Sequence, residues 1–381
     1  MSATDGNGAA EETLSARQAE IAAKLNAARA LLARHSADAL HLTTVASAAW
    51  ITAGAGAYVN ESVDAAAFGI LITENAAIIL TDPIEEPRLR EEERLEELGF
   101  TFTVEPWYAR GPALEKLSAG KRVADETAPE WRGLQRELAQ IRAKLAPGEQ
   151  ARLRAGARLA ADALRETVLA IRSGMTESEV AARLMLASRN RGGTAVVALV
   201  GSDDRIAKYR HPLATDKPIE RYAMVVLSFR YHGLILSLTR CVHFGELPDS
   251  LRETALAVAK VDANVIAATR EGRTLADMFE FIKRQYAEAG QPHAIEEHHQ
   301  GGPGGSLGRE AFATPTASDW SIKVGQSFAW NPSLRGAKSE DTVLLTASGH
   351  EVVTNAPDWP TWGIETAEGV IARPAILEVS Q

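Results

Sequence analysis

The feature that most constrains this fold is a helix–turn–helix junction that occurs twice in the second part of the chain. In the first copy, apolar residues recur at steps of three and four between Leu153 and Ile171, which predicts a long amphipathic helix. This helix is expected to stop at Gly174, and Thr176 with Glu179 forms a Thr-x-x-Glu capping box that starts the next helix.

The second copy has the same order further along the chain. A helix over residues 250–270 is predicted to stop at Gly272, and Thr274 with Asp277 starts the following helix. Strand-like apolar segments come after each pair of helices. Two such halves can join their sheets and enclose a cleft that both halves line. The predicted fold class is therefore α/β (α+β), with a pseudo-two-fold internal repeat.

The first part of the chain predicts a smaller α/β domain, because short apolar strands alternate with helical segments. Residues 1–13 are expected to be a disordered leader, and Pro147-Gly148 punctuates the chain, so we place an N-terminal domain at 14–147 and a second domain at 148–381. The elements expected in the N-terminal domain are a helix over 14–34, a strand at Ala39–Thr43, a hairpin of Ala67–Ile72 and Ala76–Leu80, a charged helix over Glu85–Leu98, strands at Phe100–Val104 and Arg122–Ala124, and a helix over Trp131–Leu145.

The composition narrows the expected partners. The 381 residues fit two domains, and the single cysteine, Cys241, cannot form an internal disulfide, which predicts a reducing, cytoplasmic environment. No apolar run approaches the roughly 20 residues of a membrane span. The net charge is −9 and there is no Lys/Arg-rich stripe, which argues against nucleic acid. A small molecule or a short peptide is the expected partner.

Several short motifs of the second domain occur in the order found in a known family. They are Arg172-Ser-Gly-Met-Thr-Glu177, Tyr209-Arg-His-Pro212, Gly233 with Leu238-Thr-Arg240, Val324-Gly325, Asn331-Pro332 and Ser339-Glu-Asp-Thr-Val343. With these motifs, residues 149–381 resemble the catalytic domain shared by aminopeptidase P, methionine aminopeptidase and creatinase, which has the pita-bread fold. Residues 15–145 are similar, more loosely, to the N-terminal domain of creatinase and aminopeptidase P. The resemblance implies a hydrolase of C–N bonds that forms a homodimer.

The chain departs from this family at the metal ligands. The metallopeptidases of the family hold two metal ions with two Asp, one His and two Glu, because hard divalent cations take oxygen donors. Four of these five positions hold other residues here, so we predict no metal site, no cofactor, and a purified protein without stoichiometric Mn, Zn, Co or Fe. The matching positions are Ser228 or Val226 for the first Asp, Ser237 for the second, Gly302 for the His, Asn331 for one Glu, and Glu340, which is retained.

Three residues that remain are predicted to be catalytic. His211 matches the histidine that contacts substrate in the metallopeptidases and shuttles a proton in creatinase, a family member that needs no metal. His298 and His299 are adjacent, so on an extended segment they face opposite ways and one of them can point into the cleft. His298 is preferred because its distance of eleven positions from Arg309 matches a second active-site histidine of aminopeptidase P. Glu340 is expected to orient a protonated histidine or to hold a substrate cation, with an ion pair to Arg240, Arg309 or Arg335 as the alternative. We expect His211, His298 and Glu340 to converge in one cleft.

Five further residues are candidates for substrate binding. Arg309 can grip a carboxylate with two parallel hydrogen bonds, and the amide of Asn331 can both donate and accept. Tyr209 belongs to the motif that carries the proton-shuttle histidine. Trp50 and Tyr58 lie in a loop-rich stretch of the N-terminal domain, and the resemblance implies that this domain covers the cleft of a neighbouring subunit.

The sequence leaves three functions open. The first is a metal-independent hydrolase that cleaves a C–N bond of a small amide, an amidine or a short peptide by His/Glu acid–base catalysis. The second is a metal-dependent Xaa-Pro aminopeptidase with ligands of another kind. The third is a catalytically inactive protein that binds peptides or partner proteins, as the fold does in histone-chaperone relatives. A lyase reaction on the same scaffold also stays open.

Overall fold

The structure, a computed structural model, describes residues 13–380 and divides into two compact units. The units exchange short segments around the predicted boundary at Pro147-Gly148, because α5 (Arg132–Ala143) and α6 (Pro147–Leu169) each contribute residues to both. The N-terminal unit contains the described residues up to Leu138 and the segment Ala146–Ala155, and the C-terminal unit contains Ala139–Leu145 and the chain from Gly156 onward.

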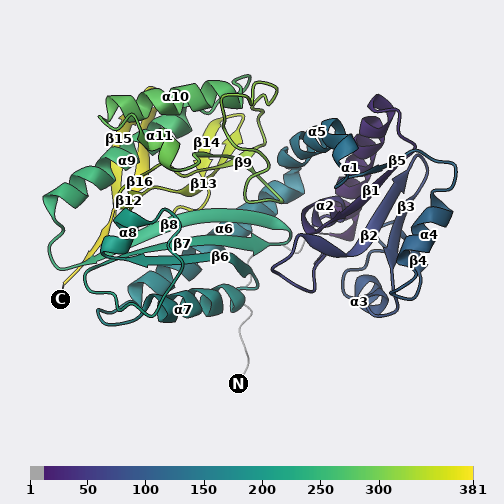
Figure 1. The fold of residues 1–381 in the computed structure, drawn as a ribbon, viewed down its shortest axis with the longest axis horizontal. Helices are drawn as coiled ribbons and strands as arrows, with labels where there is room; N and C mark the ends of the chain where they lie inside the picture. Colours follow the sequence, from purple (N-terminus) through teal and green to yellow (C-terminus); the bar gives the residue numbers. More distant parts are fainter. Residues whose placement is uncertain (1–12, 381) are drawn as a thin grey trace. The chain divides into compact units, whose positions relative to one another are not determined.

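The N-terminal unit is built on a five-stranded mixed sheet with the order β4-β3-β2-β1-β5 (Figure 1). The predicted hairpin is confirmed, since β2 and β3 pair antiparallel. Of the leader expected at residues 1–13, Thr13 caps the first helix, and the rest lies outside the described residues. The elements are α1 (Leu14–Arg34), β1 (Ala39–Thr44), α2 (Val45–Ile51), β2 (Ala65–Thr73), β3 (Ala77–Thr81), α3 (Glu86–Glu91), β4 (Thr101–Val104), α4 (Arg110–Leu117), β5 (Val123–Asp125) and η1 (Pro129–Trp131).

One predicted helix of this unit is wrong. The helix expected over Glu85–Leu98 ends at Glu91, as α3. Arg94 then takes a positive φ of 56°, and the N–H of Leu95 donates to the carbonyl of Leu89. Leu89 and Leu95 are both fully buried, although residues six apart on a continuous helix would face different directions. The break at Arg94 returns the second leucine to the core.

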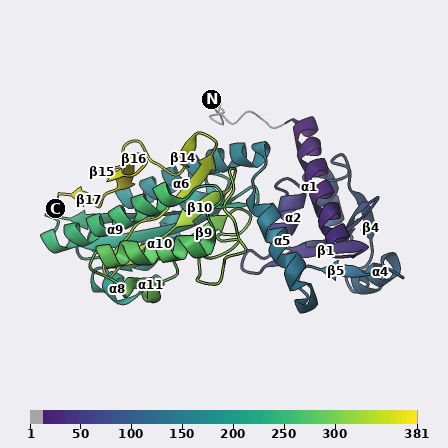
Figure 2. The same ribbon diagram turned by 90° about the horizontal axis from the view of Figure 1, so that it is seen from above.

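The C-terminal unit contains two four-stranded sheets in the described residues, with the orders β17-β8-β7-β6 and β14-β13-β10-β9. Figure 1 shows α7 beside the first sheet, and Figures 1 and 2 show α9 and α10 beside the second. No helix within residues 13–380 is both long and apolar enough to cross a membrane. The elements are α7 (Glu177–Arg189), β6 (Thr194–Ser202), α8 (Asp204–Lys208), β7 (Tyr222–Tyr231), β8 (Leu234–Phe244), α9 (Asp249–Ala268), α10 (Leu275–Glu288), α11 (Ala294–Glu297), β9 (Gly301–Gly304), β10 (Ser327–Trp330), β11 (Ser333–Leu334), β12 (Ala337–Lys338), β13 (Asp341–Thr346), β14 (Gly349–Val352), β15 (Thr361–Thr366), β16 (Gly369–Pro374) and β17 (Leu377–Val379).

The predicted internal repeat is confirmed at both junctions. Thr176 and Thr274 each form a complete capping box at the start of the second helix of their pair. Gly174 and Gly272 both have a positive φ, near 90° and 84°, which a residue with a Cβ adopts only under strain. Each glycine N–H donates to a carbonyl further along its own half: Gly174 to Ile219 at 2.8 Å, and Gly272 to Ile322 at 2.9 Å.

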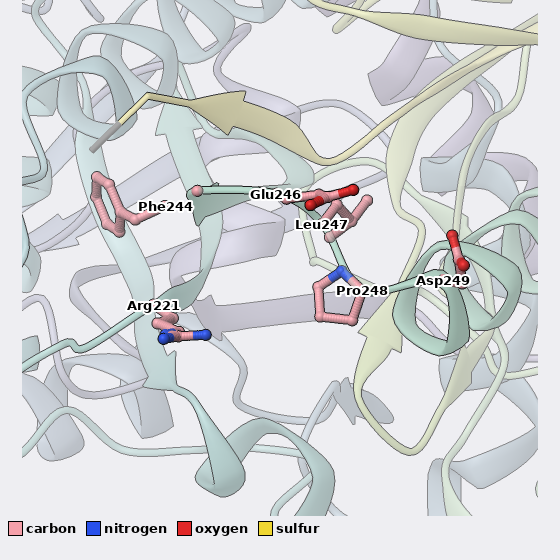
Figure 3. Close-up of a pocket in the computed structure, with 7 residues that line it drawn as sticks. Arg221, Phe244, Glu246, Leu247, Pro248 and Asp249 are labelled. Atoms are coloured by element: carbon pink, nitrogen blue, oxygen red, sulfur yellow. The ribbon is translucent and has the colours of Figure 1, made fainter.

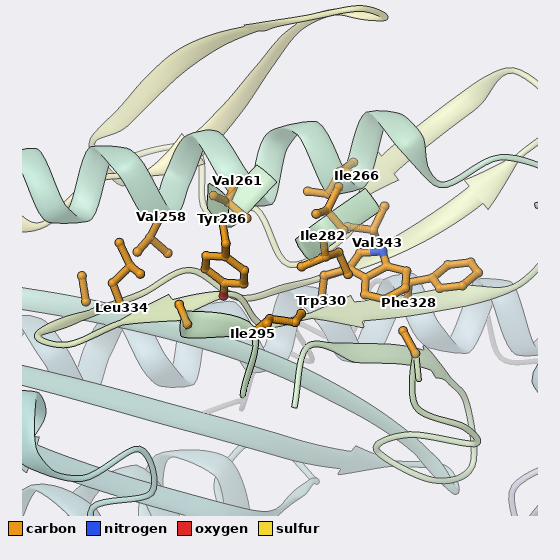
Figure 4. Packing of buried hydrophobic residues seen from close by; sticks show 14 of the residues in the cluster. Val258, Val261, Ile266, Ile282, Tyr286, Ile295, Phe328, Trp330, Leu334 and Val343 are labelled. Carbon is orange, nitrogen blue, oxygen red and sulfur yellow. The ribbon is translucent and has the colours of Figure 1, made fainter. Parts of the chain in front are cut away.

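The core of the second half packs α9 and α10 against the sheet that contains β10 and β13 (Figure 4). The rings of Phe328 and Trp330 stack with centroids 5.6 Å apart, and the indole N–H of Trp330 donates to Thr269. This packing supports the strands that carry the site. Other members of the cluster are Val258, Val261, Ile266, Ile282, Tyr286, Ile295, Leu334 and Val343.

The two four-stranded sheets meet where β8 passes the start of β13. The N–H of Thr239 donates to the carbonyl of Glu340 at 3.0 Å, and the N–H of Ser237 donates to Oγ1 of Thr342 at 2.8 Å. These bonds fix the position of one sheet relative to the other. They place the polar side chains of β8 next to Glu340, more than a hundred residues later in the chain.

Candidate active site

Two loops of the C-terminal unit bring three histidines together. His211 lies in the loop after α8, and His298 and His299 connect α11 to β9. The Nε2 atoms of His211 and His298 are 3.0 Å apart, a hydrogen bond in which one ring donates and the other accepts. The ring of His299 stacks on that of His298, with centroids 4.4 Å apart. The two histidines predicted to be catalytic are therefore in direct contact.

The prediction that His298 and His299 face opposite ways is wrong. Both rings lie beside His211, with centroids 4.9 and 6.0 Å from it. The two residues belong to the connection before β9, which begins at Gly301, so the alternation of side chains in a paired strand does not apply to them. The edge of Phe312 lies against His299 and helps to hold this ring, with centroids 4.8 Å apart.

An ion pair ties the two histidine loops to each other. Arg210 precedes His211, Glu297 precedes His298, and the guanidinium of Arg210 donates to the carboxylate of Glu297. Arg335 donates to the same carboxylate at 2.9 Å. This pairing between the residues next to the histidines holds the two rings within hydrogen-bond distance.

Burial and the nearby cations favour the neutral form of the three imidazoles. Burial and the nearby ammonium of Lys338 lower the pKa of His298 to about 3 and also lower the pKa of His211. The surrounding protein and the guanidinium of Arg309 lower the pKa of His299 to about 4. A neutral imidazole carries one N–H and one free lone pair, so each ring can both accept and donate a proton.

Glu340 is buried, and two cationic side chains of the protein balance its negative charge. Its Oε1 accepts a hydrogen bond from Arg309 at 3.0 Å, and its Oε2 lies 2.9 Å from the ammonium of Lys338 and accepts a bond from Thr239 at 2.8 Å. Burial opposes ionisation, but these two cations outweigh it and hold the pKa of Glu340 at about 2. Glu340 is therefore held in its ionised form, and its lowered pKa makes it a weak base at neutral pH, which argues against the proton-transfer part of the prediction.

The ion pair with Arg309 is one of the alternatives that the sequence left open for Glu340. The other two candidates have different partners, since Arg240 pairs with Asp341 and Arg335 with Glu297. The carboxylate still acts on the histidines through space: its charge partly offsets the lowering of the pKa of His211 and His298 by Lys338. Glu340 thus lies beside the histidine cluster, and within the described residues no hydrogen bond joins it to the histidines.

The positions that correspond to the family's metal ligands do not fit a dinuclear metal site. Ser228 lies opposite Ser237 on β7 and β8, and their hydroxyls hydrogen-bond to each other at 3.0 Å. Gly302 has no room for a side chain, because a Cβ there would lie 2.3 Å from the carbonyl oxygen of Ala311. Asn331 supplies a neutral amide. Two hydroxyls, a glycine and an amide lack the anionic donors that such a pair of ions requires.

Two cationic side chains, those of Arg309 and Lys338, lie among these residues. The guanidinium of Arg309 contacts both Glu340 and the hydroxyl of Ser237, the latter at 3.4 Å. Lys338 contacts Glu340 from β12. The side chains of Arg309 and Lys338 are 8% and 6% exposed, so both charges are held inside the protein. Both pair with Glu340, the one position of the metal-ligand set that keeps a carboxylate.

Two residues of this site were missed by sequence reasoning. Lys338 stands two positions before Glu340, a spacing that puts both side chains on one side of an extended segment and is a usable signal. His299 was set aside because the distance of eleven positions from Arg309 favours His298.

The predicted substrate-binding residues differ in their surroundings. Asn331 is 2% exposed, and within residues 13–380 its Oδ1 has no hydrogen-bond partner. Tyr209 is 49% exposed at the end of α8, two residues before His211. Trp50 is only 2% exposed, and its ring lies 5.6 Å from the ammonium of Lys24 inside the N-terminal unit. A side chain buried in this way does not reach a neighbouring subunit, so the prediction for Trp50 is corrected, whereas Tyr58 is partly exposed and stays a prediction.

A pocket of about 390 Å³ lies elsewhere, where β8 leads into α9 (Figure 3). Its lining is a short turn with Phe244 and Leu247 on one side and Arg221 across from it. None of the predicted site residues lines this pocket. This pocket is therefore separate from the histidine cluster.

The duplicated fold is the pita-bread fold. A solved structure with this fold, the Xaa-Pro dipeptidase from Bacillus anthracis, matches with a TM-score of 0.73 and 20% identity over 94% of this chain and 100% of that one. The chain belongs to metallopeptidase family M24, which it matches over residues 151–347. This membership places the chain among the peptide-bond hydrolases and confirms the family predicted from the motifs.

Two further similarities bear on the function. The chain is 26% identical over 217 residues to the uncharacterized peptidase YqhT of Bacillus subtilis (strain 168), an alignment that covers 54% of this chain and 60% of that protein. The N-terminal domain of the FACT complex subunit SPT16 from Cicer arietinum matches with a TM-score of 0.66 and 11% identity, over 91% of this chain and 97% of that one. The fold is thus shared by peptidases and by a domain of another kind of protein.

Proposed function

We propose that the protein is a hydrolase that cleaves a C–N bond of a small amide, an amidine or a short peptide without a metal ion. The observation that carries this proposal is the contact between His211 and His298, whose Nε2 atoms are 3.0 Å apart. The pair lies near a former metal-ligand group in which Arg309 and Lys338 have taken the place of external cations. Membership of the peptidase family supports a peptide or a related amide as substrate.

In the proposed reaction the histidine pair moves one proton. A neutral ring accepts it from the attacking water, and the hydrogen bond between the rings lets the pair return it to the leaving nitrogen. The two cations are offset by the single carboxylate of Glu340, so one positive charge remains to stabilise the negative charge that develops on the carbonyl oxygen. Arg309 and Lys338 supply this charge through the protein's own side chains.

Asn331 is proposed to orient the substrate. Its Oδ1 is a buried acceptor for which the described residues provide no donor, and a buried polar atom without a partner costs about 1–3 kcal/mol. An N–H of the substrate amide would satisfy it. The same atom does not help an oxyanion, since acceptor and anion repel, so the contact selects the nitrogen side of the scissile bond.

The test of metal independence is turnover after chelation. Protein dialysed against EDTA should hydrolyse a member of a panel of Xaa-Pro dipeptides, simple dipeptides and small amidines at the rate of the undialysed protein, within about twofold. Elemental analysis of the purified protein before dialysis should find no stoichiometric Mn, Zn, Co or Fe. Activity that disappears with EDTA and returns with Mn²⁺ or Co²⁺ would establish the metal-dependent peptidase instead.

A binding protein is the second candidate, and the similarity to the SPT16 domain favours it. It predicts no turnover on the whole panel together with saturable binding of a peptide. Because the histidine pair has no evident use in such a protein, replacing His211 should then leave the peptide affinity unchanged. A chain that neither turns over nor binds any peptide of the panel would contradict both functions.

We also propose that the protein is a homodimer, as the resemblance implies. The mass measured by light scattering at micromolar concentration should be twice the 40.9 kDa of one chain. If Tyr58 reaches the cleft of a neighbouring subunit, Tyr58→Ala should raise KM while leaving kcat within about twofold. The exposed Tyr108, in the same unit, provides the matched control as Tyr108→Ala. A monomeric mass would contradict this proposal.

A further inference from the structure

We propose that His211, His298 and His299 form a binding site for one divalent transition-metal ion, best suited to Zn²⁺. This site is separate from the five positions that hold metal in the metallopeptidases. One nitrogen from each of the three histidines lies within 4.8 Å of the others.

The spacing suits a tetrahedral ion. Two nitrogen ligands at Zn–N distances of about 2.0–2.1 Å lie about 3.3 Å apart in tetrahedral geometry. The Nε2 atoms of His211 and His298 are already 3.0 Å apart, so a small separation of the rings makes room for the ion. Three histidines leave the fourth position for water or a small anion.

The ligands are of the type that zinc binds. Imidazole binds a metal through the lone pair of an unprotonated ring nitrogen, and three such rings are gathered here. In addition, Nδ1 of His298 is buried and has no hydrogen-bond partner within residues 13–380, so the ring is not committed to a backbone group and can turn toward an ion. The rings of His211 and His299 are accessible from solvent, which gives the ion a way in.

The neighbouring charges limit the affinity. Arg309 and Lys338 carry two positive charges close to the cluster, and Glu340 carries one negative charge. The net repulsion makes the site weaker than a three-histidine site with a carboxylate behind each ring. We therefore expect binding in the micromolar range, with an ion that can be removed by EDTA.

Occupation of the site has a consequence for catalysis that rests on the proposed function. An ion bound to His211 and His298 takes the lone pairs that the proposed proton transfer uses. Zn²⁺ should then inhibit the enzyme at the concentrations at which it binds, and EDTA should restore the full rate. The site would make the enzyme sensitive to free zinc.

The experiment measures binding without substrate. Protein stripped with EDTA is titrated with Zn²⁺ by calorimetry and with Co²⁺ by visible absorption, which reports a cobalt ion bound by nitrogen ligands in a site of low coordination. One ion per chain is expected, with at least a tenfold loss of affinity in His299→Ala and in His298→Ala. His293→Ala, which changes an exposed histidine at the start of α11, is the matched control and should bind as the wild type does.

The outcomes separate this site from the proposed function. Absence of saturable binding up to millimolar Zn²⁺, or binding that persists in both His298→Ala and His299→Ala, would overturn the site. Zinc copurifying at one ion per chain and lost in these variants would support the site and contradict the metal-free purified protein expected from the sequence. Turnover that requires the bound ion would support the site and overturn metal independence. Binding by a protein that turns over no substrate would support the site alone.

Discussion

Replacing His211 by alanine is expected to lower kcat roughly 10²–10⁴-fold, the contribution of a positioned proton-transfer group. The physical reason is its 3.0 Å contact with His298, which leaves no second group to pass the proton when one ring is removed. The measurement is kcat and KM on the best substrate of the panel in the presence of EDTA. Urea unfolding should change little, because the side chain of His211 is accessible from solvent and fills no core.

The hydrogen-bonded pair also predicts how the losses combine. His298→Ala should cost about as much as His211→Ala, and the double variant should be no worse than either, since residues that act as a unit lose their effect together. His293→Ala should keep the wild-type rate. A His211→Ala protein with normal kcat, or two losses that multiply in the double variant, would contradict a shared proton.

The second large effect concerns stability. Lys338→Met is expected to lower the free energy of unfolding by about 3 kcal/mol, the lower end of the range for breaking a buried ion pair, because Arg309 still contacts the carboxylate. The lost ammonium leaves Glu340 with one cation in place of two, inside the protein. Urea unfolding followed by circular dichroism measures the change. Lys323→Met, at an exposed lysine of the same unit, is the control and should stay within about 0.5 kcal/mol of wild type.

A second variant makes this prediction specific to charge. Glu340→Gln removes the carboxylate that Arg309 and Lys338 share and leaves two buried cations without an anion, so it should cost more than Lys338→Met, which leaves one cation and one anion in contact. If the loss in Lys338→Met came from packing of the lysine stem, Glu340→Gln would cost less than Lys338→Met. A change of less than about 1 kcal/mol in Lys338→Met would show that Arg309 alone holds the carboxylate.

The same ion pairs make the stability depend on pH. The pKa of Glu340 is about 2 in the folded protein, below the value of about 4.3 expected for an unpaired glutamate in the unfolded chain. A carboxyl group whose pKa falls on folding contributes stability that is fully present above the unfolded pKa and is lost as the pH drops from there through the folded pKa. The wild type should therefore lose stability between pH 4.3 and 2 faster than the Glu340→Gln variant does.

Features that depend on a few neighbouring residues could be read from the sequence. Both capping boxes, the two glycines that end the preceding helices and the hairpin of β2 and β3 are set by residues three or four apart, whose hydrogen bonds form within one turn. The sequence also predicts the replacement of the metal ligands, because Ser237, Gly302 and Asn331 carry no anionic side chain.

The sequence by itself thus determined the fold class, the repeat and the two histidines that pair. Only the tertiary structure decided which charges surround them. His211 and His298 are 87 residues apart, and Thr239 is 101 residues before Glu340, so their contacts depend on how two sheets and two loops pack. The turn of His299 into the cluster, the inward position of Trp50 and the neutralisation of Glu340 all follow from that packing. Contacts between segments so distant are fixed by the cooperative burial of the whole core, which no local pattern encodes.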